Sequence, residues 1–213
     1  MLLGSEVQAR DWLTALPNVS REALERLDQF VALLREANEA QNLIAASTAG
    51  DALWVRHIAD SAQLLTLAAD WSEEGRWIDL GSGPGLPGLV IAMALPRWTV
   101  RLVESRRLRC DFLRHCVTEL DLPNVEVIEG RVEQLDPSAH DVISARAFAP
   151  LPKLLASARH LAGKNTLWLL PKGRNAVNEL SSIAHAWQGL FHVEPSLTDV
   201  EARILVGRGV VSG

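Results

Sequence analysis

The 213-residue chain has the size and composition of one globular α/β protein. It is 48% hydrophobic and 22% charged, which suits a single core of substantial size. No apolar run reaches the roughly 18 residues of a membrane span, and residues 1–10 lack the basic start and apolar block of a signal peptide. We therefore expect a cytoplasmic protein without membrane association, and a monomer.

Metal and disulfide chemistry are not indicated. The two cysteines, Cys110 and Cys116, lie six residues apart in one predicted helix, on different faces, and are expected to be reduced thiols. The six histidines form no cluster with metal-ligand spacing. The net charge of -5 disfavours a nucleic-acid partner, because phosphates favour basic surfaces. Such a partner would have to be held by local basic patches.

Residues 1–70 are predicted to form a helical extension packed on a domain of residues 71–213. Ser20 can cap a helix whose apolar residues recur at helical spacing, namely Leu24, Leu27, Val31 and Leu34. A polar bridge over 45–50 precedes a second predicted helix over 51–67. The sequence Trp-Ser-Glu-Glu-Gly over 71–75 then indicates a turn.

After this turn, short β-rich runs alternate with helices. The predicted strands are 76–80, 99–104, 125–129, 141–145, 166–170, 190–194 and 203–206, and the predicted helices are 88–95, 108–120, 151–160 and 176–187. Repeated βα units predict a doubly wound, seven-stranded, mostly parallel α/β sheet. The last two strands are separated by about eight residues, too few for a helical crossover, so they should pair antiparallel at the sheet edge.

A glycine-rich loop directly follows the first predicted strand. Residues 79–85 read Asp-Leu-Gly-Ser-Gly-Pro-Gly. Glycines at this density allow sharp turns and close approach of the backbone to a ligand, because no Cβ intervenes. A strand that ends in such a loop and then opens a helix builds a nucleotide pocket at the carboxyl edge of a parallel sheet.

Two cofactor patterns overlap in this loop. Residues 83–88 match the dinucleotide pattern G-x-G-x-x-G, and residues 79–85 match the acid-x-G-x-G-x-G pattern of methyltransferases that use S-adenosylmethionine. Pro84 and Pro87 lack the N–H groups that a pyrophosphate needs, whereas Asp79 suits a cationic sulfonium. Glu104 can accept the ribose hydroxyls of either cofactor. S-adenosylmethionine is therefore favoured, and a nicotinamide cofactor is the alternative.

Residues 79–88 resemble the cofactor loop of the ribosomal RNA small subunit methyltransferase G family. Other segments agree with that family in the same order along the chain: Asn42-Leu43-Ile44, Arg56–Ser61, Arg131–Glu133, Ser144–Ala149 and Pro171–Arg174. Ile44 departs from the family's threonine, and Arg106-Arg107-Leu108-Arg109 departs from its Leu-Gly-Lys-Arg while keeping the positive charge. The resemblance covers about residues 42–180.

The resemblance implies a class I, Rossmann-like methyltransferase that methylates guanine N7 of 16S ribosomal RNA in the decoding region. It implies S-adenosylmethionine contacts at Gly81, Leu86, Val132, Glu133 and Arg146. From the loop pattern and the second strand end, we also expect cofactor contacts at Asp79, Gly83, Gly85 and Glu104.

Guanine N7 carries a lone pair and no proton, so its methylation needs no general base and depends mainly on positioning. Arg146 and Phe148 follow the fourth predicted strand and are the predicted catalytic residues, with Phe148 stacking on the base. The predicted RNA contacts are Arg56, His57, Arg106, Arg107, Arg109, Arg114, Lys172 and Arg174. Packed or solvated side chains without a functional role are the alternative for each of them.

Two further interpretations of the whole chain stay open. A small-molecule methyltransferase on the same scaffold is favoured by the acidic net charge and opposed by the arginine cluster. A cofactor-binding scaffold without catalysis would bind the ligand but show no turnover on any RNA.

Overall fold

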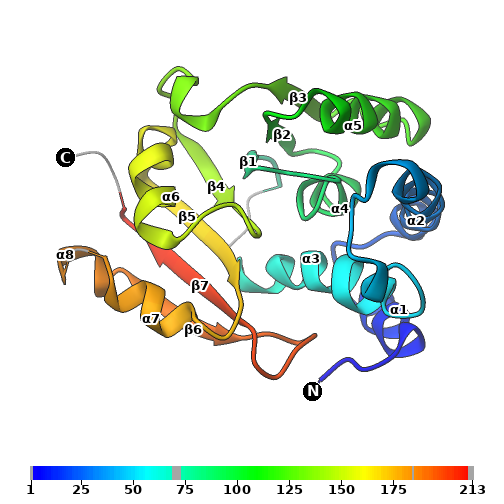
Figure 1. The fold of residues 1–213 in the computed structure, drawn as a ribbon, viewed down its shortest axis with the longest axis horizontal. Coiled ribbons are helices and arrows are strands. Elements are labelled where there is room, and N and C mark those ends of the chain that lie inside the picture. The colour runs from blue at the N-terminus through cyan, green and yellow to red at the C-terminus, as the bar shows by residue number, and fades with distance from the viewer. Residues whose placement is uncertain (1, 69–72, 184, 211–213) are drawn as a thin grey trace.

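A single mixed sheet organises the protein. The computed structural model describes residues 2–68, 73–183 and 185–210, and within them the strands form one seven-stranded sheet in the order β3-β2-β1-β4-β5-β7-β6 (Figure 1). The strands are β1 (Arg76–Leu80), β2 (Thr99–Glu104), β3 (Val125–Glu129), β4 (His140–Ser144), β5 (Ala162–Lys172), β6 (Phe191–Pro195) and β7 (Arg203–Arg208). The pairs β3-β2, β2-β1, β1-β4 and β4-β5 are parallel. The predicted fold class is confirmed.

The last two strands pair antiparallel, as predicted. β7 lies inside the sheet between β5 and β6 and runs antiparallel to both, so β6 forms the edge. The burial of the two strands agrees with this order, because Ile204–Gly207 of β7 are buried whereas only Phe191 of β6 is. At Gly207 a Cβ would collide with the ring of Phe191, so the close pairing of these strands requires glycine there.

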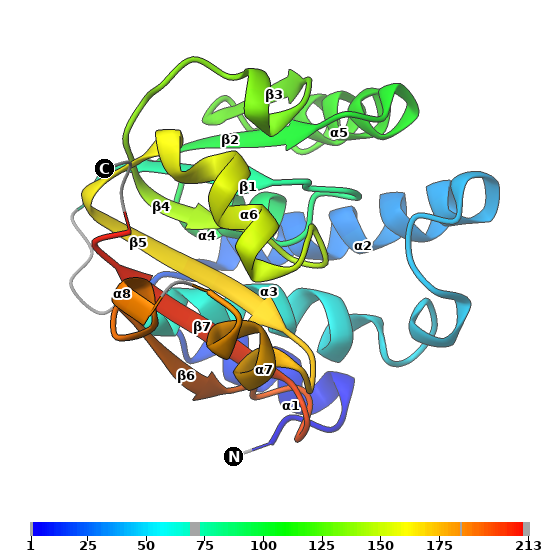
Figure 2. The same cartoon turned by 60° about the vertical axis from the view of Figure 1, so that its left-hand side comes forward.

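Helices cover both faces of the sheet (Figures 1 and 2). They include α4 (Gly88–Ala94), α5 (Arg107–Glu119), α6 (Leu151–Ala158), α7 (Ala176–Ser181) and α8 (His185–Gln188). Successive residues of β1 point to opposite faces. Trp77 therefore joins the apolar cluster of α4 and the N-terminal helices, while Ile78 joins the cluster of α6 and α7. The predicted helix over 176–187 is two short helices, and residue 184 between them lies outside the described residues.

The N-terminal segment is helical, as expected. It contains α1 (Glu6–Thr14), α2 (Arg21–Gln41), η1 (Ala46–Thr48), η2 (Trp54–Ala59), α3 (Asp60–Ala62) and η3 (Gln63–Leu67). The Ser20 side chain accepts a hydrogen bond from the N–H of Ala23 and caps α2. The predicted helix over 51–67 is continuous but irregular, with π-helical geometry in η2 and 3-10 geometry in η3. Residues 71 and 72 of the predicted turn lie outside the described residues.

The helices from η2 to η3 run beside the connection between β6 and β7, at the carboxyl edge of the parallel strands. The Gln63 side chain accepts a hydrogen bond from the N–H of Leu197, and the guanidinium of Arg56 donates to the carbonyl of Thr198. This contact sets one wall of the site described below. None of the described helices combines the length and the apolar character needed to cross a membrane.

Candidate active site

The glycine loop folds against the end of β2. Gly81, Gly83 and Gly85 have φ values of +69°, +56° and +92°, a left-handed conformation that glycine adopts without a Cβ penalty. The N–H groups of Gly81 and Ser82 both donate to the carbonyl of Val103, at 2.8 and 3.1 Å. The positive φ values therefore turn the chain from β1 across to β2.

Glu104 is held by backbone donors at the end of β2. One carboxylate oxygen accepts the N–H groups of Ser105 and Arg106, at 2.7 and 2.9 Å. The other accepts the N–H of Gly83 at 3.1 Å and lies 3.8 Å from the guanidinium of Arg109. These contacts fix the carboxylate before any ligand arrives, and its remaining lone pairs are the acceptors available to a diol.

A cavity of about 300 Å³ opens beside this carboxylate, at the lower end of the size range of small-molecule sites. It brings together the predicted cofactor residues Gly81, Glu104, Val132 and Glu133, and Phe148 of the predicted catalytic pair. Arg106 and Arg109, which we predicted to contact RNA, line the same cavity. Arg109 belongs there because the first turn of α5 faces back toward the end of β2.

Asp79 does not lie where we expected. Its side chain is fully buried and therefore presents no surface to a bound ligand. One oxygen accepts the hydroxyl of Ser144 at 2.6 Å, and the other accepts the N–H of Gly88 at 3.2 Å. Burial raises the pKa of Asp79 to about 6, although these hydrogen bonds act in the opposite direction. The predicted direct contact with a cationic cofactor is thus replaced by a role in holding the loop to α4 and β4.

Gly85 and Leu86 are packing positions in this structure. A Cβ at Gly85 would collide with the side chain of Leu89. The Leu86 side chain belongs to the apolar core. Neither residue is among those that line the cavity beside Glu104, so this cavity gives no support to their predicted cofactor contacts.

The loop after β4 carries Arg146 and Phe148 to the same edge of the sheet. Arg146 donates to the Asp60 carboxylate and to the Arg56 carbonyl, both at 3.2 Å. Ala147 has a φ of +52°, which is uncommon for a residue with a side chain. The Phe148 ring then lies over Gly81, where an added Cβ would be 2.5 Å from its Cδ2 atom. The predicted catalytic pair therefore borders the glycine loop.

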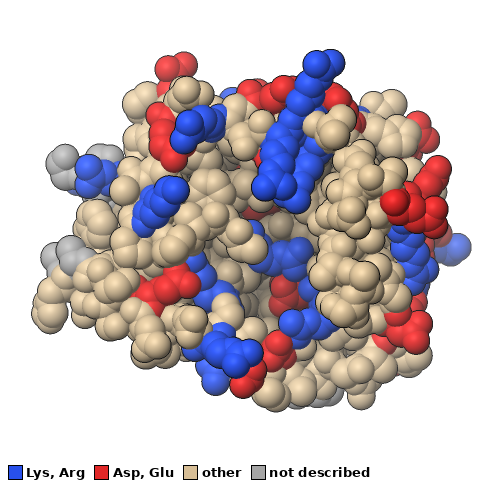
Figure 3. All heavy atoms as spheres, in the orientation of Figure 1, with Lys and Arg blue, Asp and Glu red and all other residues tan. Residues whose placement is uncertain are grey.

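A second cavity of about 630 Å³ lies on the other side of this loop. Figure 3, drawn in the orientation of Figure 1, shows a hollow near the centre of the molecule, with basic and acidic side chains in and around it. Phe148 lines both cavities. Four ion pairs contribute to the lining of the larger one: Arg146–Asp60 at 3.2 Å, Arg56–Asp199 at 2.7 Å, Lys172–Glu179 at 2.8 Å and Arg174–Glu201 at 3.6 Å.

The acidic partners in this cavity were missed by the sequence reasoning. Asp60 lies within the segment Arg56–Ser61 that supported the family resemblance, so a signal for it was present. Asp199 and Glu201 belong to the connection between β6 and β7, where no motif marks them. Their place in the site follows only from the antiparallel return of β7 beside β5.

Two predicted RNA contacts are engaged by other residues of the protein. His57 is 9% exposed, and its Nε2 lies 2.8 Å from the hydroxyl of Thr48. Burial, with Arg146 and Arg56 nearby, lowers the pKa of His57 to about 4, so the ring is neutral at pH 7 and offers no charge to a phosphate. The Lys172 side chain is also 9% exposed and is engaged by Glu179. His57 is therefore corrected to a buried position, whereas Lys172 is half-buried and lines the larger cavity.

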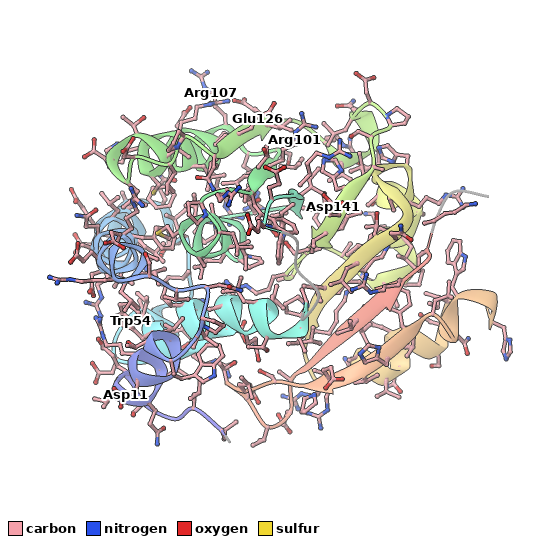
Figure 4. The ribbon with its side chains drawn as sticks, turned by 180° about the vertical axis from the view of Figure 1, so that it is seen from behind. Asp11, Trp54, Arg101, Arg107, Glu126 and Asp141 are labelled. Carbon is pink, nitrogen blue, oxygen red and sulfur yellow. The ribbon has the colours of Figure 1, made fainter. Side chains whose placement is uncertain are left out.

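The remaining basic residues lie at the surface. Arg107 is 85% exposed at the start of α5 (Figure 4), and its closest carboxylate, Asp111, is 4.0 Å away. Arg106 is also exposed. Arg114 is paired with Glu129 at 2.9 Å and with Asp111 at 3.2 Å. Arg174 is 76% exposed. Of these four, Arg107 and Arg106 are the cations least occupied by a close carboxylate.

Comparison with solved structures supports the fold. A mutant of MtNAS in complex with S-adenosylmethionine has a TM-score of 0.57 at 20% identity, with 83% of this chain and 73% of that chain covered. An S-adenosylmethionine-dependent methyltransferase from Aquifex aeolicus has a TM-score of 0.57 at 14% identity, with 82% and 98% covered. Both share the doubly wound sheet.

Sequence comparison identifies the family. Residues 23–204 match the family model for rRNA small subunit methyltransferase G. A ribosomal RNA small subunit methyltransferase G from Sphingopyxis alaskensis is 54% identical over 99% of this chain and 89% of its own length. Its counterpart from Novosphingobium aromaticivorans is 50% identical, with 98% and 90% covered. The chain therefore belongs to the rRNA small subunit methyltransferase G family.

Proposed function

We propose that the protein transfers a methyl group from S-adenosylmethionine to N7 of a guanine in 16S ribosomal RNA, in the decoding region of the small subunit. The main support for this proposal is that two cavities of different size share Phe148 in their lining. The smaller one suits an adenosine cofactor, and the larger one suits a nucleotide removed from its stack. Methyl transfer requires such adjacency, because the reacting atoms must come within about 3–3.5 Å.

The residues of the smaller cavity fit the cofactor. Glu104 offers a fixed carboxylate to the ribose hydroxyls. Val132 and Glu133 line the wall expected to meet the adenine, and Gly81 lines the same cavity at the place that we assign to the amino-acid tail. When bound, S-adenosylmethionine supplies an electrophilic methyl group: the new C–N bond forms as the C–S bond breaks, and the electron pair stays with sulfur.

The larger cavity provides the substrate side. Phe148 offers a ring on which the guanine can stack, and Arg146 offers N–H donors beside it. Methylation leaves the guanine positively charged at N7 without release of a proton. The carboxylates of Asp60 and Glu179 in this cavity are paired with Arg146 and Lys172, and no proton has to be removed from the base. The chain's own task is therefore to position the base.

The exposed arginines Arg106, Arg107 and Arg174 are the proposed phosphate contacts, despite the net charge of -5. We also propose that the protein acts as a cytoplasmic monomer, and that the helical extension over residues 1–70 supplies one wall of the base cavity through Arg56 and Asp60.

Labelled methyl transfer tests the proposal directly. Purified protein is incubated with labelled S-adenosylmethionine and either naked 16S ribosomal RNA or the small-subunit particle, and the product is mapped by mass and by cleavage at N7-methylguanine. Label at a guanine N7 supports the proposal, and its absence from both substrates contradicts it. Thermal shift with S-adenosylhomocysteine and with NAD separates the two cofactor classes. Transfer to a metabolite but to neither RNA substrate would favour a small-molecule methyltransferase.

A further inference from the structure

Lys172, at the end of β5, connects three segments around the larger cavity. We infer that it is a positioning residue for methyl transfer: its ammonium fixes the loop that separates the cofactor cavity from the base cavity. This inference rests on the proposed function and assigns to Lys172 a different role from the phosphate contact that its sequence motif indicated.

The contacts of Lys172 point inward. Nζ donates to the carbonyl of Ala149 and to the carboxylate of Glu179, both at 2.8 Å. The same Glu179 oxygen accepts the N–H of Leu151, also at 2.8 Å, and Leu151 is the first residue of α6. One ion pair thus ties the end of β5, the loop before α6, and α7 together.

The loop is also held at its other end. Arg146 is anchored to Asp60 and to the carbonyl of Arg56, so the loop is fixed just before Ala147 and just after Phe148. Between these anchors the chain takes the left-handed conformation at Ala147 and carries the Phe148 ring over Gly81. The position of this short segment therefore sets how close a base in one cavity can come to a cofactor in the other.

A phosphate contact fits these observations poorly. The Lys172 side chain is 9% exposed, and two of the three donors of its ammonium are already engaged by Ala149 and Glu179, so a phosphate would compete with a carboxylate that is in direct contact. Arg174, two residues further on, is 76% exposed and is far better placed to meet RNA. We call the contacts of Lys172 with Ala149 and Glu179 the Lys172 brace. Loss of this brace is expected to misplace the loop, and about 1 Å of misplacement can reduce a rate about 100-fold.

Lys172→Met and Glu179→Gln test the inference. Met removes the ammonium with little change in length, and Gln keeps the volume while removing the charge. We expect each variant to lower the single-turnover methyl-transfer rate at saturating RNA by roughly 10- to 100-fold. The dissociation constants for S-adenosylhomocysteine and RNA should change by less than about twofold, and the salt dependence of RNA binding should be unchanged.

Lys164→Met is the matched control, because Lys164 is an exposed residue near the other end of β5 and should leave every readout unchanged. Hydrogen exchange gives a readout that needs no RNA: the amide of Leu151, which donates to Glu179, should exchange faster in both test variants than in this control. If Lys172→Met does not fold, Glu179→Gln decides.

Three results would overturn the inference. One is a wild-type transfer rate in the folded variants. Another is unchanged exchange of the Leu151 amide. The third is weaker RNA binding by Lys172→Met, with a salt slope reduced by about 1, combined with tighter RNA binding by Glu179→Gln, because that pair of effects marks a phosphate contact. Failure of the wild-type protein to methylate RNA would instead contradict the proposed function, and the exchange measurement would still test the brace.

Discussion

The ring of Phe148 lies against the backbone of Gly81, so close that a Cβ at Gly81 would be 2.5 Å from Cδ2 of the ring. Two segments that are distant in sequence, the glycine loop after β1 and the loop after β4, are thereby in direct contact at the point where the two cavities meet. The contact requires glycine at position 81 for two reasons: a Cβ would collide with the ring, and the φ of +69° is strained for any other residue.

Gly81→Ala should therefore abolish cofactor binding. The new methyl group strains the backbone at positive φ and displaces Phe148 into the cofactor cavity. We expect the dissociation constant for S-adenosylhomocysteine to rise about 100-fold or more by calorimetry, which corresponds to about 2.8 kcal/mol. Gly50→Ala is the control, because a Cβ at Gly50 meets nothing within 4 Å and its φ is not positive. Near-normal binding by Gly81→Ala would show that the ring can move aside freely.

Removal of the aromatic ring at position 148 should affect substrate use more than cofactor affinity. Stacking of a base on an aromatic ring contributes about 1–3 kcal/mol. Phe148→Leu should therefore lower kcat/KM for RNA by roughly 5- to 150-fold, whereas Phe148→Tyr keeps the ring and should stay close to the wild-type value. Equal activity of the Leu and Tyr variants would contradict a stacking role and leave Phe148 as a packing residue.

Two arginines on the first turn of α5 should separate into different roles. Arg109 lines the cofactor cavity 3.8 Å from Glu104, so Arg109→Met should weaken S-adenosylhomocysteine binding about tenfold and leave the salt dependence of RNA binding unchanged. Arg107 is 85% exposed. Arg107→Met should spare the cofactor, weaken RNA binding most visibly at low salt, and reduce the salt slope by about 1. The opposite assignment of effects would place the RNA face elsewhere.

The sequence predicted what depends on local pattern and on parallel topology. The glycine loop follows β1, and Glu104 ends the neighbouring parallel strand β2, so the two lie at the same edge of the sheet. The hydrogen bond from the N–H of Gly83 to Glu104 confirms that they are in contact. The alternation of side chains along β1 also indicates where Asp79 lies. Asp79 shares a face of the strand with the buried Trp77, which places its carboxylate in the interior next to α4.

Partners that are distant in sequence were not predictable in the same way. His57 and Lys172 belong to basic sequence motifs, but in the structure they contact Thr48 and Glu179. No local sequence pattern predicts those two contacts. Asp199 pairs with Arg56 across 143 positions in the chain. A charged side chain alone does not reveal whether its counterion is a phosphate or a carboxylate of the same protein.

The buried Asp79 should give stability a pH dependence that Asp79→Asn removes. Its pKa is about 6 in the folded protein against a usual 3.8, so between these values the folded state binds more protons than the unfolded state. By linkage, the contribution of Asp79 to stability is fully present below about pH 3.8, is lost as the pH rises to about 6, and is constant above that. The total loss is about 3 kcal/mol.

Urea unfolding of the wild type and of Asp79→Asn between pH 4 and pH 7 measures this contribution as a difference. Asparagine loses the hydrogen bond from Gly88 at every pH, because its amide nitrogen donates where the carboxylate accepted. That cost does not depend on pH, and the contributions of other titrating groups such as His57 are the same in both proteins and cancel in the difference. Asp79→Asn should therefore gain about 2.4 kcal/mol relative to the wild type as the pH rises from 4 to 7. A difference that stays flat would mean that Asp79 titrates in the folded protein as it does in the unfolded chain, and that its carboxylate is solvated.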